Sequence, residues 1–483
     1  MGHIFGRERE IGILDKLVES SKAEFLAIYG RRRVGKTFLV DSYFRDKGVY
    51  FHFTGMKGAT LQEHLKIFRS AVKRRLSGGE IGKISSWIDA FEILIDEIEK
   101  IDQEQKVIIF FDELPWIDTR RSGFLKALEH FWNDYFSRKT NAILVVCGSA
   151  ASWMIEKIVH NKGGLHNRLT AKMRLEPFTL KQTKDFLEGR KIHLSDKQII
   201  DLYLAVGGVA KYLTYVEKGL STPQIIQHLC FMRDSPLVSE YKILYSSLFN
   251  NYHIHMEIVE ALAKKRSGLT HSELLKAIQR TSGGRFSSVL EELSEAGFIS
   301  FIPTFNKKKK EGKYYLVDEY TFFYLTWIKT ATIDGKNALS SDHWLSLHGS
   351  TKFSAWAGFA FETLCKKHIS EMIHRLGINT VAASIVHWVC PHKESQEGLQ
   401  IDLIIDRNDN AMNLCEIKYY NSVAHFSSES ARKMNARRER FRVLTRSRKT
   451  LFNTLISVYG AEENSHYLEA FDNQITADAF FVN

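Results

Sequence analysis

The stretch of residues 30–37, GRRRVGKT, constrains the fold of this chain more than any other part of its sequence. It begins at the end of the apolar run FLAIYG (25–30), and a helical pattern follows it. A glycine-rich loop between a buried strand and a helix presents its backbone N–H groups, at the positive end of the helix dipole, to an anion. The alternative, a plain glycine turn, is disfavoured by this strand-loop-helix context. The sequence therefore predicts a phosphate-binding loop in an α/β domain.

The residues of this loop have separate expected roles in holding a nucleotide and Mg²⁺. Lys36 is expected to reach the β- and γ-phosphates, and the Thr37 hydroxyl is expected to hold Mg²⁺. Gly30 and Gly35 permit the tight turn and the close approach of the phosphates. The other loop positions assigned to nucleotide binding are Arg31, Arg32, Arg33, Val34 and Phe38.

Two further apolar runs end in polar residues that fit beside such a loop. The run VIIFF (107–111) leads to Asp112 and Glu113. We expect Asp112 to orient the water shell of Mg²⁺ and Glu113 to polarise the attacking water. The run AILVVCG (142–148) leads to Ser149, which is predicted either to sense the γ-phosphate or to form an ordinary turn at a strand end.

At 483 residues the chain is too long for one hydrophobic core. Its first part alternates helical patterns with short apolar runs, which predicts a parallel sheet in a three-layer α/β domain. Changes in the spacing of apolar residues divide the rest of the chain into further segments. We expect a P-loop ATPase core over 1–175, a helical lid over 176–245, a winged helix-turn-helix over 246–330, a linker over 331–350 and a second α/β domain over 351–483.

The predicted winged helix rests on three helical patterns followed by two strand-like segments. Between these segments lie Lys307–Lys310, continued by Lys313. In a winged helix this turn is the wing, directed at the phosphate backbone, while the helix over 285–293 faces the major groove. The alternative is a solvated hairpin tip. The coincidence of helix order and basic turn favours DNA contact.

A second group of polar residues lies near the C-terminus. Asp402 is in one strand-like segment, and Glu416 and Lys418 are two residues apart in the next, so that both point to the same face. Carboxylates on adjacent strands bind Mg²⁺, and a neighbouring lysine helps to activate water. Glu362, in a helical pattern upstream, is a further candidate ligand. The alternative is a surface hairpin with an ordinary Glu-Lys pair. The basic helical pattern over 432–449 supplies charge for tracking a phosphate backbone.

The composition narrows the class of partner. The formal net charge of +11 favours a polyanionic partner. Lysines and arginines that neutralise the phosphates of a nucleic acid gain affinity, because they release the counterions bound there. The five cysteines lie far apart without CxxC pairs, which argues against a zinc ribbon or a disulfide framework. Apolar runs fall short of the roughly 18 residues of a membrane span, and the first residues lack the apolar segment of a signal peptide. We therefore expect a cytoplasmic protein that binds DNA and no membrane, with a homo-oligomer or a protein regulator as compatible partners.

Four segments together resemble the AAA+/STAND ATPases, and specifically the archaeal-type ATPase family that is also common in bacteria. They are FGRE (5–8), GRRRVGKT (30–37), FFDELPW (110–116) and CGSAAS (147–152). The resemblance implies ATP over GTP, with Phe5, Gly6 and Arg7 packed against the adenine. It also implies a γ-phosphate arginine, for which Arg168 is the candidate, and a lid motif at GGVA (207–210), with alanine where proline is usual.

The arrangement of Asp402, Glu416 and Lys418 resembles the PD-(D/E)XK nucleases. The C-terminal domain of many archaeal-type ATPase relatives resembles that fold too, so the resemblance implies a restriction-endonuclease-like domain over 351–483. Gln400 and Ile401 stand where a proline and an acid often precede the aspartate.

Three functions follow for comparison. The preferred one is an ATPase with a winged helix and a metal-dependent DNA endonuclease. The second is an ATP-driven molecular switch that binds DNA or protein without cutting it. The third, a membrane-associated transporter ATPase, is disfavoured because the sequence shows neither a span nor a transporter signature.

Overall fold

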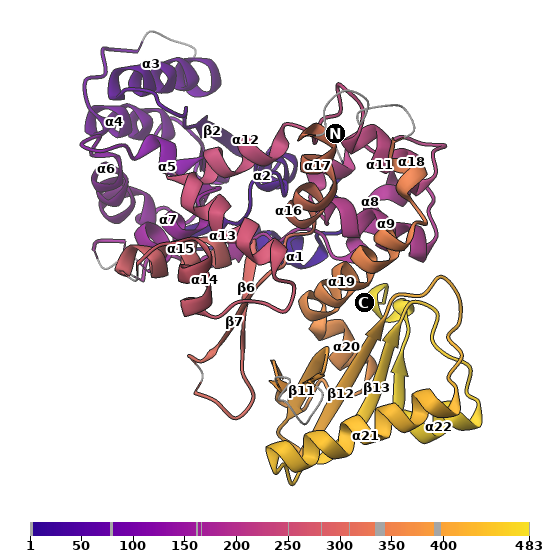
Figure 1. Cartoon of the computed structure of the whole chain (residues 1–483). Helices are drawn as coiled ribbons and strands as arrows, with labels where there is room; N and C mark the ends of the chain where they lie inside the picture. Colours follow the sequence, from indigo (N-terminus) through magenta and orange to yellow (C-terminus); the bar gives the residue numbers. More distant parts are fainter. Residues whose placement is uncertain are drawn as a thin grey trace. The chain divides into compact units, whose positions relative to one another are not determined.

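The computed structural model describes residues 3–77, 81–160, 163–165, 167–249, 251–281, 283–308, 310–333, 343–390 and 398–482. His166, Lys309 and residues 334–342 of the predicted linker lie outside the described residues. The chain divides into two compact units, Met1–Pro177 and Phe178–Asn483 (Figure 1).

The first unit is a three-layer α/β domain around one parallel sheet. Its strands are β1 (Glu24–Tyr29), β2 (Val49–Thr54), β3 (Val107–Asp112), β4 (Ala142–Gly148) and β5 (Ala171–Arg174). They lie in the order β2-β3-β4-β1-β5, and all neighbours are parallel. Its helices are α1 (Glu8–Glu19), α2 (Lys36–Phe44), α3 (Leu61–Val72), α4 (Trp87–Ile98), α5 (Leu114–Ile117), α6 (Phe124–His130) and α7 (Ala151–Met154).

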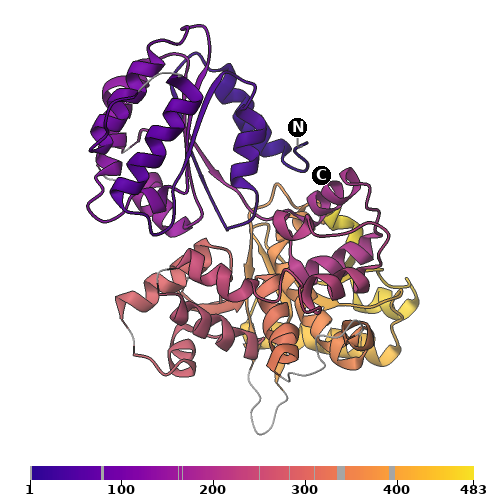
Figure 2. The same ribbon diagram turned by 90° about the horizontal axis from the view of Figure 1, so that it is seen from above.

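Each face of this sheet is covered by its own set of helices. Every residue of β3 and β4 is buried, as expected for strands with helices on both faces. The core on one face takes side chains from α3, α4 and α6, and the core on the other takes side chains from α1 and α2. Figure 2 shows these two helical layers on either side of the sheet. The predicted parallel α/β fold is thus confirmed.

The edge strand β5 has no counterpart among the predicted strands. Only Met173 of its four residues is buried, so the sequence lacks the apolar run that marks the inner strands. The strand is defined by pairing alone, because Leu26–Tyr29 of β1 pair with Ala171–Arg174. An edge strand of this kind is recruited by a neighbour that already lies in the sheet.

The second unit begins with helices and the hairpin β6–β7. Its first elements are α8 (Leu180–Gly189), α9 (Asp196–Val206), α10 (Ala210–Leu213), α11 (Thr222–Cys230), α12 (Glu240–Leu248), α13 (Tyr252–Lys264), α14 (His271–Ala277), α15 (Gly284–Glu295), β6 (Ile299–Pro303), β7 (Gly312–Leu316), α16 (Glu319–Phe323), α17 (Lys329–Ile333) and α18 (His343–Leu347). Capping boxes begin α8, α9, α11 and α14, in which a Ser or Thr and a Gln or Glu three residues later satisfy the first N–H groups.

The rest of this unit surrounds a mixed sheet. Its elements are α19 (Thr351–Lys367), α20 (Ile369–Arg375), β8 (Ala383–Val386), β9 (Val389–Cys390), β10 (Leu399–Gln400), β11 (Leu403–Arg407), β12 (Ala411–Lys418), α21 (Ser428–Thr445), β13 (Thr450–Ser457), α22 (Ser465–Ala470) and β14 (Asn473–Ile475). The sheet has the order β14-β13-β12-β11-β8. β11 is antiparallel to both of its neighbours, and β12, β13 and β14 are parallel.

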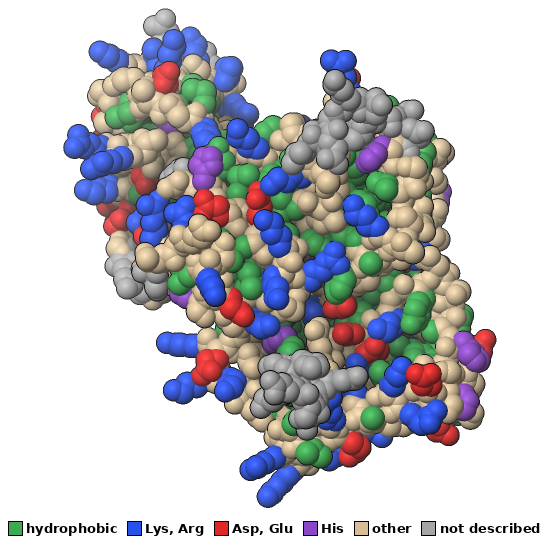
Figure 3. Space-filling view, viewed as in Figure 1, with side chains coloured by type: hydrophobic (Ala, Val, Ile, Leu, Met, Phe, Trp, Pro, Cys, Tyr) green, Lys and Arg blue, Asp and Glu red, His purple; other side chains and the backbone are tan. Residues whose placement is uncertain are grey.

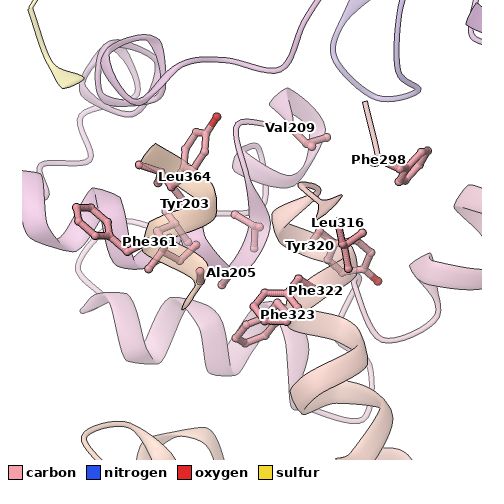
Figure 4. Close-up of a cluster of buried hydrophobic side chains, with 14 of the residues drawn as sticks. Tyr203, Ala205, Val209, Phe298, Leu316, Tyr320, Phe322, Phe323, Phe361 and Leu364 are labelled. Atoms are coloured by element: carbon pink, nitrogen blue, oxygen red, sulfur yellow. The ribbon is translucent and has the colours of Figure 1, made fainter. Parts of the chain in front are cut away.

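One continuous core joins the helices of the second unit to this sheet. Figure 4 shows part of it, where side chains from α9, α16 and α19 converge, among them Tyr203, Tyr320, Phe322, Phe323, Phe361 and Leu364. The motif Gly207–Gly208 lies beside it and needs both glycines. Gly207 ends α9 with a φ of 64°, and a Cβ on Gly208 would lie 1.8 Å from the Phe178 carbonyl oxygen.

The end of the predicted linker differs from a free connector. Residues 343–347 form α18, whose Trp344 is fully buried. Trp344 stacks on Phe231 at 5.2 Å between ring centroids, and its backbone N–H donates to the Gln227 side chain. Burial of the large apolar surface of Trp344 favours the packing of this otherwise polar segment against the helices of the second unit.

All five cysteines are free thiols. Among the residues that the structure describes, every helix is too short or too polar to cross a membrane.

Candidate nucleotide site and acidic cluster

The loop between β1 and α2 needs its two glycines. Gly30 has a φ of 141°, and a Cβ there would lie 2.3 Å from the Leu175 carbonyl oxygen. Gly35 caps α2 in the left-handed region with a φ of 97°. Both positions therefore exclude ordinary L side chains, and the chain turns sharply into the N-terminus of α2. Backbone N–H groups at this helix end provide the favourable potential for phosphate that the sequence predicts.

Lys36 is held at the centre of this loop. Its side chain is buried, and Nζ donates hydrogen bonds of 2.9 Å to the carbonyl oxygens of both Gly30 and Arg31. A third bond, of 3.1 Å, goes to Oγ of Ser149 at the end of β4. The ammonium group is thus positioned by neutral oxygens rather than by a carboxylate, so its charge is left to interact with an anion.

The oxygen atoms of Thr37 and Asp112 fit a hard cation. The Thr37 hydroxyl donates to Oδ2 of Asp112 at 2.6 Å, and Asp112 is buried at the end of β3. A hydroxyl and a carboxylate at this spacing, beside a phosphate loop, are the donors that Mg²⁺ takes in P-loop proteins. These two residues would hold the ion.

Glu113 lies directly beside them and is held by Ser149. Its Oε1 accepts from the Ser149 hydroxyl at 2.7 Å, and its Oε2 accepts from the Ser149 backbone N–H at 3.2 Å. Glu113 itself adopts a left-handed backbone with a φ of 50° and donates its N–H to Asp112. The Ser149 hydroxyl therefore bridges Lys36 and Glu113.

Arg7 ties the N-terminal segment to the phosphate loop. Its guanidinium is buried and donates to the carbonyl oxygens of Val34, at 3.2 Å, and Glu176, at 2.9 Å. Burial lowers the pKa of Arg7 to about 10, which still leaves it charged at neutral pH. Gly6 precedes it with a φ of 61°, and the Phe5 ring packs edge-on against His3. Arg7 thus braces the loop, beside the adenine contact that the resemblance implies for this segment.

His52 is a member of the site that sequence reasoning missed. Its ring stacks on Phe110 of β3 at 4.5 Å, Nδ1 lies 3.0 Å from Oδ1 of Asp41, and Nε2 lies 4.0 Å from Oδ2 of Asp112. The only signal was its place in β2, two residues before Thr54, which is in register with Asp112. The Nε2–Asp112 distance is too long for a hydrogen bond, and Nε2 instead lies 2.9 Å from the Thr54 hydroxyl, so His52 lies beside the Asp112 carboxylate without bonding it.

The structure does not bring every predicted residue to the loop. Arg31 and Val34 are buried within it, while Phe38 is 51% exposed on α2. Arg168 lies just before β5, where Thr170 bonds the backbone of Phe25 near the start of β1. The phosphate loop follows the other end of β1. Within this unit the Arg168 backbone therefore lies away from the phosphate loop, because parallel strands all begin at the edge opposite their carboxyl ends, and the γ-phosphate role implied for Arg168 stays a prediction.

The C-terminal residues Asp402, Glu416 and Lys418 do lie together. Asp402 stands just before β11, and its Oδ2 accepts from the backbone N–H of Ile417 at 2.9 Å. On β12, Glu416 Oε1 lies 2.7 Å from Lys418 Nζ, and its other oxygen pairs with Arg437 of α21. Glu362 on α19 is paired with Lys366 at 3.8 Å.

Charge balance governs the protonation of this acidic cluster. Burial and the nearby Glu416 raise the pKa of Asp402. Burial also acts to raise the pKa of Glu416, but Arg437 and Lys418 outweigh it and hold this pKa below its usual value. Burial raises the pKa of Glu362 to about 7, with the Asp402 charge adding to the effect. The cluster thus holds one firmly ionised carboxylate, Glu416, between two cations.

Both oxygens of Glu416 are paired with cations in this structure, one with Lys418 and the other with Arg437. Within the described part of the chain, His, Cys, Asp and Glu side chains form no group of three or more that could hold a metal ion. Mg²⁺ needs only one or two carboxylates besides water, so the metal site predicted at Asp402, Glu416 and Glu362 stays a prediction. The sequence analysis had not singled out Arg437, whose guanidinium lies beside Glu416.

Comparison with known proteins assigns the first half of the chain. Residues 4–216 match the model of a family described as an ATPase domain predominantly from Archaea. Residues 338–434 match a second family, described as archaeal and bacterial proteins of unknown function. An uncharacterized protein of Methanocaldococcus jannaschii, MJECL04, is 25% identical over 425 residues, which are 86% of this chain and 87% of that protein.

Two solved structures are similar at low identity. The Walker-type ATPase PABY2304 of Pyrococcus abyssi is 15% identical, with 67% of this chain and 96% of that chain covered and a TM-score of 0.48. The ORC2 protein of Aeropyrum pernix, in its ADPNP-ADP complexes, is 14% identical, with 68% and 95% covered and a TM-score of 0.46. The family match and the loop geometry together support a P-loop ATPase domain within residues 4–216, with a nucleotide as its ligand.

Proposed function

We propose that this protein is an ATP-driven switch, which hydrolyses ATP at the loop of residues 30–37 and binds DNA through its second unit. The observation that carries the first half is the chain of contacts from Lys36 through Ser149 to Glu113, beside the Thr37–Asp112 pair. These side chains supply phosphate-binding, metal-holding and water-orienting groups of the kind that phosphoryl transfer to water uses. The match to an ATPase family supports the same activity.

The residues divide the work as follows. Loop N–H groups and Lys36 bind the phosphates and offset their negative charge. Thr37 and Asp112 would hold Mg²⁺, which when bound neutralises the charge that develops on the phosphate oxygens. Glu113 orients the attacking water and accepts its proton. Ser149 positions Glu113 through two hydrogen bonds, so water is aligned only when the end of β4 is in place.

The experiment that tests the ATPase site replaces Glu113 with Gln. We expect Glu113→Gln to retain ATP binding and to lower turnover by about 10²–10⁴-fold, because only the basic oxygen is lost while Asp112 remains. Nucleotide affinity is measured by equilibrium titration and turnover by phosphate release. Glu92→Gln, at an exposed position of α4, is the matched control and should behave like the wild type. A Glu113→Gln protein with unchanged turnover would contradict the role assigned to this carboxylate.

DNA binding is the second half of the proposal. The elements α13, α14, α15, β6 and β7 follow one another in the order that the sequence analysis assigned to a winged helix. The described wing lysines, Lys307, Lys308 and Lys310, are exposed. α15 buries Phe286, Val289, Leu290 and Leu293 and exposes acidic as well as basic side chains, so it offers no marked preference for a base sequence. We therefore infer contact with phosphates rather than with base edges.

Metal-dependent cleavage of DNA is a second candidate activity, favoured by the close approach of Asp402, Glu416 and Lys418. It requires Arg437 to leave Glu416, because both oxygens of this carboxylate are paired with cations. The test incubates labelled duplex, single-stranded and branched DNA with the protein, ATP and Mg²⁺ or Mn²⁺. If the activity exists, Asp402→Ala should abolish cleavage and any metal-dependent rise in melting temperature. Wild-type protein that cuts nothing and shows no such rise leaves the switch as the function.

A further inference from the structure

The wing is built into the sheet of the C-terminal region. Past the end of β6, Thr304 forms a parallel bridge with His387, the residue that follows β8. The His387 N–H donates to the Pro303 carbonyl, and the Phe305 N–H donates to the His387 carbonyl, each at 2.8 Å. The base of the wing therefore continues a sheet edge, and the hairpin does not project alone from its helices.

Side chains reinforce this joint. The Phe305 ring lies 5.8 Å from the ring of Phe441 on α21, and Trp388 contacts the same ring at 4.9 Å. On the other strand, the Tyr315 hydroxyl lies 2.8 Å from Nδ1 of His387. Burial, with Lys313 and Lys366 nearby, lowers the pKa of His387 to about 4, so the ring is neutral at pH 7. The wing is thus held in one place by an aromatic cluster and a partly buried hydrogen bond.

The joint places the tip of the wing beside the C-terminal end of α21. The side-chain amide of Asn306 donates to the carbonyl of Thr445, the last residue of α21, at 3.5 Å. Lys307, Lys308 and Lys310 follow Asn306 on one side. Arg446, which ends the helix with a φ of 54°, and Arg448 follow Thr445 on the other. Figure 3 shows Lys and Arg side chains gathered over the hairpin β6–β7 and over this end of α21.

These five cations differ from those along the middle of α21. All five are exposed, and none is in an ion pair within the described residues. In contrast, Arg437, Arg438 and Arg442 are paired with Glu416, Asp472 and Glu439. Positive charge is therefore neutralised internally along the helix and left uncompensated at its end, where the wing lies.

We propose that the wing tip and the end of α21 form one composite surface that binds the phosphate backbone of duplex DNA. This inference rests on the proposed DNA binding and specifies where it occurs. A polyanion with regularly spaced phosphates suits two rigidly joined basic segments, because each neutralised phosphate releases a counterion. Lysine and arginine side chains at a hairpin tip and a helix end contact phosphates and not base edges, so we expect binding to be independent of sequence.

The experiment measures binding of the full-length protein to a short labelled duplex by fluorescence anisotropy over a range of salt concentrations. Three variants each remove two exposed charges: Lys307→Gln/Lys308→Gln in the wing, Arg446→Gln/Arg448→Gln at α21, and Lys218→Gln/Lys242→Gln as the matched control elsewhere in the same unit. We expect each of the first two pairs to reduce the slope of log K against log salt by about 1.8, and the control to leave it unchanged. A titration that measures stoichiometry should give one bound duplex per protein molecule, because both segments contact the same duplex.

The remaining outcomes distinguish a failure of the composite surface from a failure of the proposed DNA binding. Normal DNA binding with unchanged slopes in both variants would overturn the composite surface and leave DNA binding itself standing. A change in the wing variant alone would remove α21 from the surface. Two independent duplexes per protein would show two separate sites. Binding to phosphatidylserine vesicles but to no duplex would overturn both the surface and the proposed DNA binding. Unchanged melting temperatures in the variants exclude misfolding as the cause.

Discussion

Lys36→Ala is expected to abolish measurable ATP turnover. The ammonium group is aimed into the loop by three hydrogen bonds to neutral oxygens, so it supplies fixed positive charge at the phosphates. Loss of one preorganised donor of this kind lowers turnover by about 10²–10³-fold, and weaker phosphate binding adds to the loss. Phosphate release measures turnover, and nucleotide titration measures affinity.

The stability of this variant needs its own control, because Lys36 is buried rather than a surface ligand. Truncation removes the hydrogen bonds that Lys36 Nζ donates to the carbonyls of Gly30 and Arg31, at a cost of about 1–3 kcal/mol. Lys36→Met keeps the aliphatic stem and removes only the charge, so it separates packing from catalysis. Lys22→Ala, at an exposed position before β1, should retain full turnover. If a folded Lys36→Met protein hydrolysed ATP at the wild-type rate, the assignment of the nucleotide site to this loop would be wrong.

Arg437→Ala is expected to lower the free energy of unfolding of the second unit by about 3 kcal/mol, because it leaves a buried carboxylate without its principal cation. The side chains of Arg437 and Glu416 are 11% and 9% exposed. The adjacent Arg438 offers a matched control, since its ion pair with Asp472 is 3.4 Å long and the two side chains are 25% and 37% exposed. Arg438→Ala should cost about 1 kcal/mol or less. Urea titrations compare the two.

A double variant identifies the cause of the loss. If the uncompensated charge of Glu416 is responsible, Glu416→Gln/Arg437→Ala should be more stable than Arg437→Ala alone, since neither charge remains. Equal losses for Arg437→Ala and Arg438→Ala would mean that Arg437 does not hold the acidic cluster together. In that case the cluster would be free to take another cation, and the nuclease hypothesis would gain support.

The nucleotide site could be predicted from the sequence because the residues that form its loop are close together in the chain. Gly30, Gly35 and Lys36 lie within seven residues, and their spacing together with the flanking apolar run and helical pattern predicts a loop between a strand and a helix. Asp112 and Ser149 were located for a related reason, since fully apolar runs mark inner parallel strands whose carboxyl ends share one edge.

The sequence did not predict where His52 and Arg168 lie or that β5 forms. His52 joins the site only because β2 lies next to β3 in the sheet, and strand order is not written in any single run. Arg168 was placed by resemblance, but the return path from β4 to β5 carries it to the opposite edge. β5 carries a single buried residue and exists through its pairing with β1.

The sequence by itself thus determined which segments become inner strands, where the phosphate loop lies and which acids cluster near the C-terminus. Only the tertiary structure decided which cation accompanies those acids and where the wing lies. Arg437 reaches Glu416 across 21 residues, and Asn306 reaches Thr445 across 139. Periodicity and spacing report contacts within one element, whereas such long-range pairs depend on how separate elements pack. The partner of a buried charge is therefore settled by the fold and not by the motif.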